Sequence, residues 1–131
     1  MVKKTLTYKD FNGNERTEDF YFNLTDFEAT ELAMDFPEDV IEGRSGAFEA
    51  LGYSGTLAMV KNTLLKAYGK KGGDDGRSFI KSAKLTEDFS NTKAFSIIAL
   101  ELFKDDGKAF NDFLMSVMEA KNDAPAAAPA N

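Results

Sequence analysis

Residues 2–28 have the sequence VKKTLTYKDFNGNERTEDFYFNLTDFE, and this stretch decides the first part of the fold. Its apolar side chains recur at alternate positions on either side of a polar link: Val2, Leu6, Tyr8, Phe20, Phe22 and Leu24. A period of two is typical of strands that bury one face. The link Asn12-Gly13-Asn14 favours a turn, because Asn and Gly tolerate a positive φ. The stretch therefore predicts an antiparallel β-hairpin.

The register of this hairpin is constrained by the apolar pattern. If Leu6 faces Phe20, the apolar residues of both strands share one face, whereas a two-residue Asn-Gly turn would place Leu6 opposite Asp19. We therefore expect Leu6 opposite Phe20, with an odd-length loop over 12–14 or a bulge.

Helix signals follow the hairpin. Thr25-Asp26-Phe27-Glu28 has the pattern of a capping box, and Pro37 predicts that the helix it opens ends at Phe36. Residues 38–55 are interrupted by glycines and fit either a short helix at 47–51 or a loop. Further helices are predicted at 56–68, 92–104 and 108–121, with a short piece at 83–89 before the second of them.

Three of these helices have an apolar stripe. In the helix at 92–104, the stripe comprises Phe95, Ile98 and Leu102. In the helix at 56–68, the stripe comprises Leu57, Val60, Leu64 and Tyr68. In the last helix, it comprises Phe110, Phe113, Leu114 and Val117.

The 131 residues are of a size for one domain with a real core. We predict an α+β fold, mostly α, with an N-terminal antiparallel β-hairpin packed on a bundle of four to five helices. The single globular domain is expected over 1–123, with the hairpin in 1–24 and the helical part in 25–122. Residues 124–131, an Ala/Pro segment, are expected to form a disordered tail.

Composition excludes several classes of chemistry. The chain has no cysteine and no histidine, which excludes thiolate nucleophiles, a Ser-His-Asp triad and cysteine- or histidine-ligated zinc. The acidic pairs Asp74-Asp75 and Asp105-Asp106 lack the spacing of a cation-binding loop. We therefore expect no catalytic residues, no metal and no cofactor. A net charge of −6 argues against nucleic-acid binding, and no apolar run is long enough for a membrane span.

Charge is distributed unevenly along the chain. Residues 1–55 carry a net charge of −7, residues 56–84 of +5, and residues 85–131 of −4. The basic segment either complements the acidic ones within the fold or forms a docking patch.

Twelve phenylalanines and five methionines suggest an apolar surface beyond what the core needs. The candidates for binding another polypeptide are on the last two helices: Phe95, Phe103, Phe110, Phe113, Met115 and Met118.

Several segments resemble one family of small phage proteins. The similarity covers about two-thirds of the chain and includes 3–14 (KKTLTYKDFNGN), 20–25 (FYFNLT), 64–69 (LLKAYG), 75–82 (DGRSFIKS), 89–95 (FSNTKAF) and Glu101-Leu102. The chain resembles the tail assembly chaperones of long-tailed phages that infect mainly Gram-positive bacteria.

The resemblance implies a protein that is not an enzyme. It implies binding to the tape-measure protein, which is kept soluble, and recruitment of tail-tube subunits. It also implies a place in the host cell cytoplasm and absence from the mature virion. Many members are made in two lengths by ribosomal frameshifting, and Ala120-Lys121-Asn122 is compatible with a slippery site. A homo-oligomer would also be compatible with the apolar hairpin.

Two other functions fit some of the same observations. A structural tail component, such as a terminator or connector subunit, is the main alternative. An acidic mimic of DNA is the other, and the basic segment 56–84 argues against it.

Overall fold

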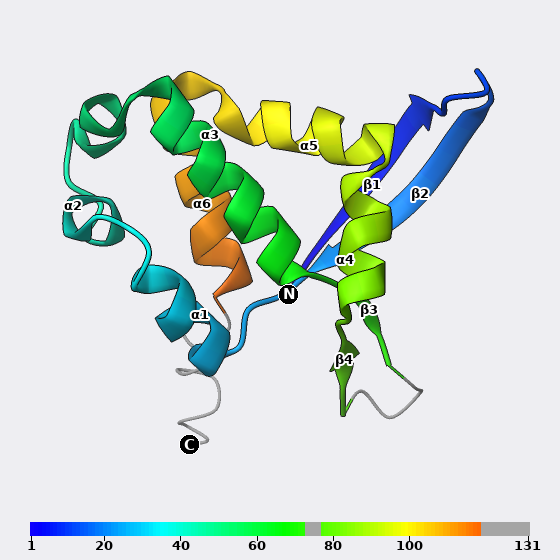
Figure 1. The fold of residues 1–131 in the computed structure, drawn as a ribbon, viewed down its shortest axis with the longest axis horizontal. Coiled ribbons are helices and arrows are strands. Elements are labelled where there is room, and N and C mark those ends of the chain that lie inside the picture. The colour runs from blue at the N-terminus through cyan, green and yellow to red at the C-terminus, as the bar shows by residue number, and fades with distance from the viewer. Residues whose placement is uncertain (73–76, 119–131) are drawn as a thin grey trace.

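The computed structural model describes residues 1–72 and 77–118. Of these residues, 57% are helical and 21% are in strands, so the predicted α+β, mostly α class is confirmed. The expected tail at 124–131 lies outside the described residues. The elements in chain order are β1 (Val2–Lys9), β2 (Glu15–Phe22), α1 (Asp26–Ala33), α2 (Glu38–Ile41), α3 (Ala47–Ala67), β3 (Tyr68–Lys71), β4 (Phe79–Ile80), α4 (Ala83–Ser90), α5 (Lys93–Phe103), the 3-10 turn η1 (Asp105–Gly107) and α6 (Lys108–Val117) (Figure 1).

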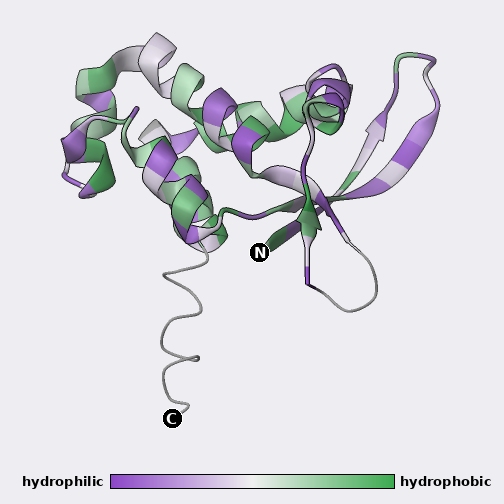
Figure 2. Cartoon of the chain, turned by 60° about the horizontal axis from the view of Figure 1, so that its bottom comes forward, coloured by the Kyte–Doolittle hydropathy of each residue, from purple (hydrophilic) through white to green (hydrophobic). Residues whose placement is uncertain are grey.

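The predicted hairpin is formed by β1 and β2, with a register two residues away from the expected one. Leu6 pairs with Glu18, and Phe20 pairs with Lys4. The loop has an odd length, as predicted, but it spans five residues, 10–14. Asp10 closes it, because its Oδ1 accepts hydrogen bonds from the backbone N–H groups of residues 12 and 14, each at 2.9 Å. An odd loop keeps Leu6, Tyr8, Phe20 and Phe22 on one face. The hydrophilic residues of the two strands are prominent in Figure 2.

Two strands that the sequence periodicity did not indicate complete the sheet. β3 pairs antiparallel with β2 and β4 pairs antiparallel with β3, which gives the order β1-β2-β3-β4. The helix predicted to reach Tyr68 therefore ends at Ala67. Gly69 lets β3 and β4 approach closely, since a Cβ at this position would lie 2.6 Å from the carbonyl oxygen of Ile80.

The capping box at the start of α1 is confirmed. The Thr25 hydroxyl accepts from the Glu28 N–H at 3.3 Å, and Glu28 Oε1 accepts from the Thr25 N–H at 3.0 Å. The α-helix ends at Ala33, and tighter turns carry the chain to Phe36 before Pro37.

The buried face of the long helix α3 differs from the apolar stripe predicted for 56–68. Val60 and Leu64 are fully buried, but Leu57 is 42% exposed and Tyr68 belongs to β3. The buried face comprises Ala47, Thr56, Met59, Val60, Thr63, Leu64 and Ala67. Of the two alternatives for 47–51, a short helix or a loop, the helix is present and forms the first segment of α3, ahead of a kink at Gly52.

The core lies between the sheet and the helices. Phe20, Phe22 and Leu24 are buried, which confirms that the hairpin packs on helices. Phe22 is at the centre, with ring centroids 5.4 Å from Phe113 and 5.8 Å from Phe89. The predicted stripe of the last helix is buried as expected. Just after α6, Met118 forms an isolated parallel β-bridge with Leu24.

No helix among the described residues has the length and apolar character needed to cross a membrane.

Candidate partner-binding surface

The six side chains predicted to bind a partner lie at different depths. Phe110 and Phe113 belong to the core, with 0% and 5% of their surface exposed. Phe95 and Met118 are partly buried and pack against that core. These four side chains are therefore integrated into the fold in this conformation, and their role in binding stays a prediction.

The other two predicted residues reach the surface. Met115 is 44% exposed on α6. Phe103 is partly buried at the end of α5, and its ring centroid lies 6.0 Å from that of Tyr53 at an interplanar angle of 65°. Tyr53, near the start of α3, is 83% exposed. Tyr53 and Phe103 together place aromatic surface in contact with solvent, and the surface around this pair is the candidate site.

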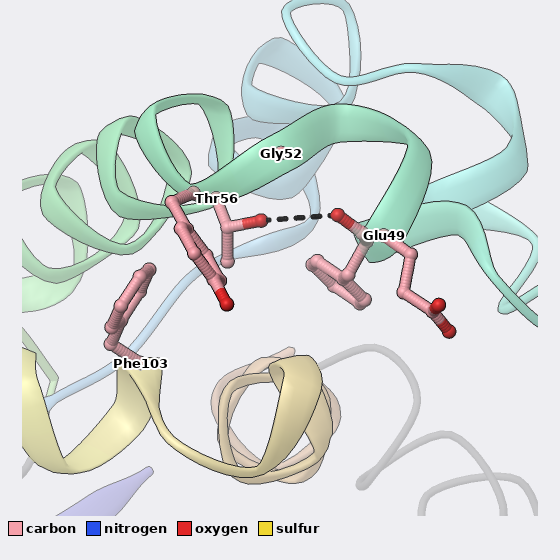
Figure 3. Close-up of a pocket in the computed structure, with 6 residues that line it drawn as sticks. Glu49, Gly52, Thr56 and Phe103 are labelled. Atoms are coloured by element: carbon pink, nitrogen blue, oxygen red, sulfur yellow. Dashed lines mark hydrogen bonds between the residues drawn. The ribbon is translucent and has the colours of Figure 1, made fainter.

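The surface beside this aromatic pair is hollowed by about 340 Å³. Figure 3 shows the hollow between the start of α3 and the end of α5. We call it the α3–α5 groove, and its lining residues are Phe48, Glu49, Gly52, Tyr53, Thr56 and Phe103.

Gly52 creates the groove. Its φ of 82° and ψ of 173° interrupt the helix, in a region of backbone conformation that essentially only glycine adopts. The segment Ala47–Leu51 therefore leaves the axis of the rest of α3. One contact across the kink is the hydroxyl of Thr56, which donates to the carbonyl oxygen of Phe48 at 3.5 Å (Figure 3).

Further apolar side chains are exposed on the two helices that form the groove. Leu57 lies one turn after Tyr53 on α3 and is 42% exposed. Leu100 lies one turn before Phe103 on α5 and is 52% exposed. The hollow is open and has both polar and apolar lining, and its two helices also carry exposed leucines. Such a surface can accept an amphipathic partner helix.

A family model described as phage tail assembly chaperone matches residues 1–128. The chain belongs to this family. No curated protein and no solved structure gives a match. The family assignment confirms the resemblance to phage tail assembly chaperones. The α3–α5 groove is thus a surface feature of a member of this family.

Sequence patterns alone did not identify most of the chaperone's groove. Phe103 was among the predicted residues, but Tyr53 and Phe48 lie in the glycine-rich stretch 38–55. Gly52 next to Tyr53 was the available signal: a glycine inside an apolar segment can mark a kink that exposes its neighbour.

Charged groups form a separate cluster, centred on Lys81. Burial lowers the pKa of Lys81, and the nearby Glu28 carboxylate only partly offsets this. Its Nζ lies 2.8 Å from Glu28 Oε1, 2.7 Å from the Lys66 carbonyl oxygen and 2.8 Å from the Asn23 carbonyl oxygen. An ammonium group has three N–H donors, so each donor of Lys81 has an acceptor. The cluster therefore holds segments together and presents no free amine for chemistry.

Part of the basic segment complements the acidic one within the chaperone. Besides the Lys81–Glu28 pair, Lys66 Nζ lies 3.0 Å from Glu31 Oε1 on α1. The part of the chain that the structure describes contains no group of three or more His, Cys, Asp or Glu side chains placed to hold a metal ion.

Proposed function

We propose that this chaperone binds the tape-measure protein of its phage through the α3–α5 groove. The observation that carries the proposal is Tyr53, a residue that is 83% exposed and whose ring lies beside Phe103 at an open hollow. Covering such a ring removes apolar surface from water, which favours association. A tape-measure helix with an apolar face would supply that cover, as in other helix-in-groove complexes.

The wider role follows from this binding. The chaperone keeps apolar tape-measure helices soluble in the host cell cytoplasm, helps to recruit tail-tube subunits and does not enter the mature virion. Its net charge of −6 supports solubility of the complex. We propose that the chaperone catalyses no reaction. We also propose that it comes from a phage of a Gram-positive host.

Co-expression tests the proposal. A tape-measure fragment from the same phage should be more soluble with the chaperone than alone, and the two should co-purify. The variant Tyr53→Ser combined with Phe103→Ala should lose this effect. Phe11→Ser is the matched control, because Phe11 is 74% exposed on the hairpin loop, outside the groove. Equal solubility with and without the chaperone would refute the proposal.

Mass spectrometry of purified virions separates the chaperone from a structural tail component. The chaperone should be absent, whereas a terminator or connector subunit would be found at a fixed number of copies. The nucleotide sequence around codons 120–122, outside the described residues, tests the proposed frameshift: an uninterrupted adenine run with an overlapping second frame is expected.

A further inference from the structure

Phe48 lines two hollows in the surface. Phe48 and Glu49 line the α3–α5 groove of about 340 Å³, and both also line a second hollow of about 210 Å³. The second hollow also involves Gly107, Lys108 and Asn111, at the start of α6.

The ring of Phe48 covers an aromatic side chain of the core. It stands edge-on to Phe110, with centroids 5.8 Å apart and an interplanar angle of 86°, and Phe110 has no exposed surface. The ring also lies against Gly107, where a Cβ would be 2.5 Å from it. If Phe48 moved away, the two hollows would join into one groove with Phe110 on its floor.

The segment that carries Phe48 is less buried than the middle of α3. Within Ala47–Leu51, Ala47 is buried, Phe48 and Leu51 are partly buried against the core, and Glu49 and Ala50 are exposed. Gly52 interrupts the helix immediately afterwards. The contact of Thr56 with the Phe48 carbonyl across this kink is 3.5 Å long, at the limit for a hydrogen bond.

We propose that Phe48 is an internal plug, and that a large apolar side chain of a bound polypeptide replaces it when Ala47–Leu51 turns about Gly52. The site thus revealed favours an aromatic or long aliphatic side chain, because the space it offers is that of a phenylalanine ring against Phe110. The identity of the bound polypeptide rests on the proposed function, whereas the movement of the plug does not.

Gly52→Ala tests the movement without any partner. Alanine is strained at a φ of 82° and favours helical backbone, so the variant should straighten α3 and withdraw Phe48. Gly13→Ala is the matched control. Gly13 also has a φ of 82°, and a Cβ at either glycine would meet no atom within 4 Å.

The readouts are amide hydrogen exchange and binding of the aromatic dye 8-anilinonaphthalene-1-sulfonate. In Gly52→Ala, exchange in the first turns of α6, around Phe110, should accelerate by about tenfold, the effect of strain at one backbone position. Dye fluorescence should rise in this variant and in Phe48→Ala. In Gly13→Ala, any local acceleration of amide exchange should be confined to the hairpin.

Three results would each overturn the proposal: unchanged exchange in α6, the same uniform acceleration in both glycine variants, or no gain in dye binding by Phe48→Ala. Since these measurements use the chaperone alone, they are independent of whether the tape-measure fragment co-purifies.

Discussion

Replacing Lys81 with methionine should destabilise the fold more than any ordinary surface substitution. The Lys81 ammonium donates to Glu28 Oε1, to the carbonyl of Asn23 after β2 and to the carbonyl of Lys66 near the end of α3. One side chain therefore ties β4 and its following loop to three other segments. Methionine retains most of the apolar stem and removes the charge and all three donors.

The magnitude follows from the burial of this cluster. Breaking a fully buried ion pair costs roughly 3–5 kcal/mol, and hydrogen bonds to charged groups contribute about 1.5–3 kcal/mol each. The side chains of Lys81 and Glu28 are 21% and 24% exposed, so water repairs part of the loss. We expect the free energy of unfolding to fall by about 3 kcal/mol and Tm by about 10 °C.

Urea unfolding followed by circular dichroism measures this loss. The matched control is Lys66→Met, which removes a more exposed pair with Glu31, at 31% and 49% exposure. That control should lose less than about 1 kcal/mol, as is typical of surface ion pairs. If Lys81→Met were no more destabilising than Lys66→Met, the cluster would not hold the segments together as described.

Three further predictions concern stability. Burial of Glu28 opposes its ionisation, but hydrogen bonds from Lys81 and Thr25 prevail and hold its pKa below the ordinary 4.5. The ionised Glu28 should therefore stabilise the fold above pH 4.5, and this stabilisation should be lost as the pH falls through the folded pKa. In urea unfolding at a series of acidic pH values, Glu28→Gln should reduce this loss of stability. Burial and a hydrogen bond to Glu18 raise the pKa of Tyr8 from 10.0 to about 12. The free energy of unfolding should therefore fall as the pH rises from 10 through 12, and Tyr8→Phe should abolish that fall. Thr25→Ala removes the cap of α1 and should cost about 1 kcal/mol by thermal unfolding; an unchanged Tm would show that the cap contributes nothing.

The features that could be predicted from the sequence are the local ones. The capping box at Thr25 and the stripe of α6 depend on residues three to seven positions apart, and both are present as predicted. The face of the hairpin was also predictable, because an odd loop preserves the alternation of side chains. Its exact register was not, since the hydrogen bonds of Asp10 extend the loop to five residues.

Long-range pairing accounts for what could not be predicted. Tyr68 continues the helical period of Leu64, yet it pairs with Phe22 because a strand 46 positions earlier offers a free edge. The groove also depends on residues that are far apart in the sequence. Phe103 could be proposed from its helix, but its partner Tyr53 lies 50 positions away and is placed by the kink at Gly52.

The most direct test of the central claim is calorimetric titration of a tape-measure fragment into the chaperone. The wild-type protein and Phe11→Ser should bind equally well, and Tyr53→Ser should bind at least about tenfold more weakly, because burial of a large apolar side chain contributes roughly 1.5–3 kcal/mol. Equal affinity of the wild-type protein and Tyr53→Ser would contradict the assignment of the α3–α5 groove as the client-binding surface.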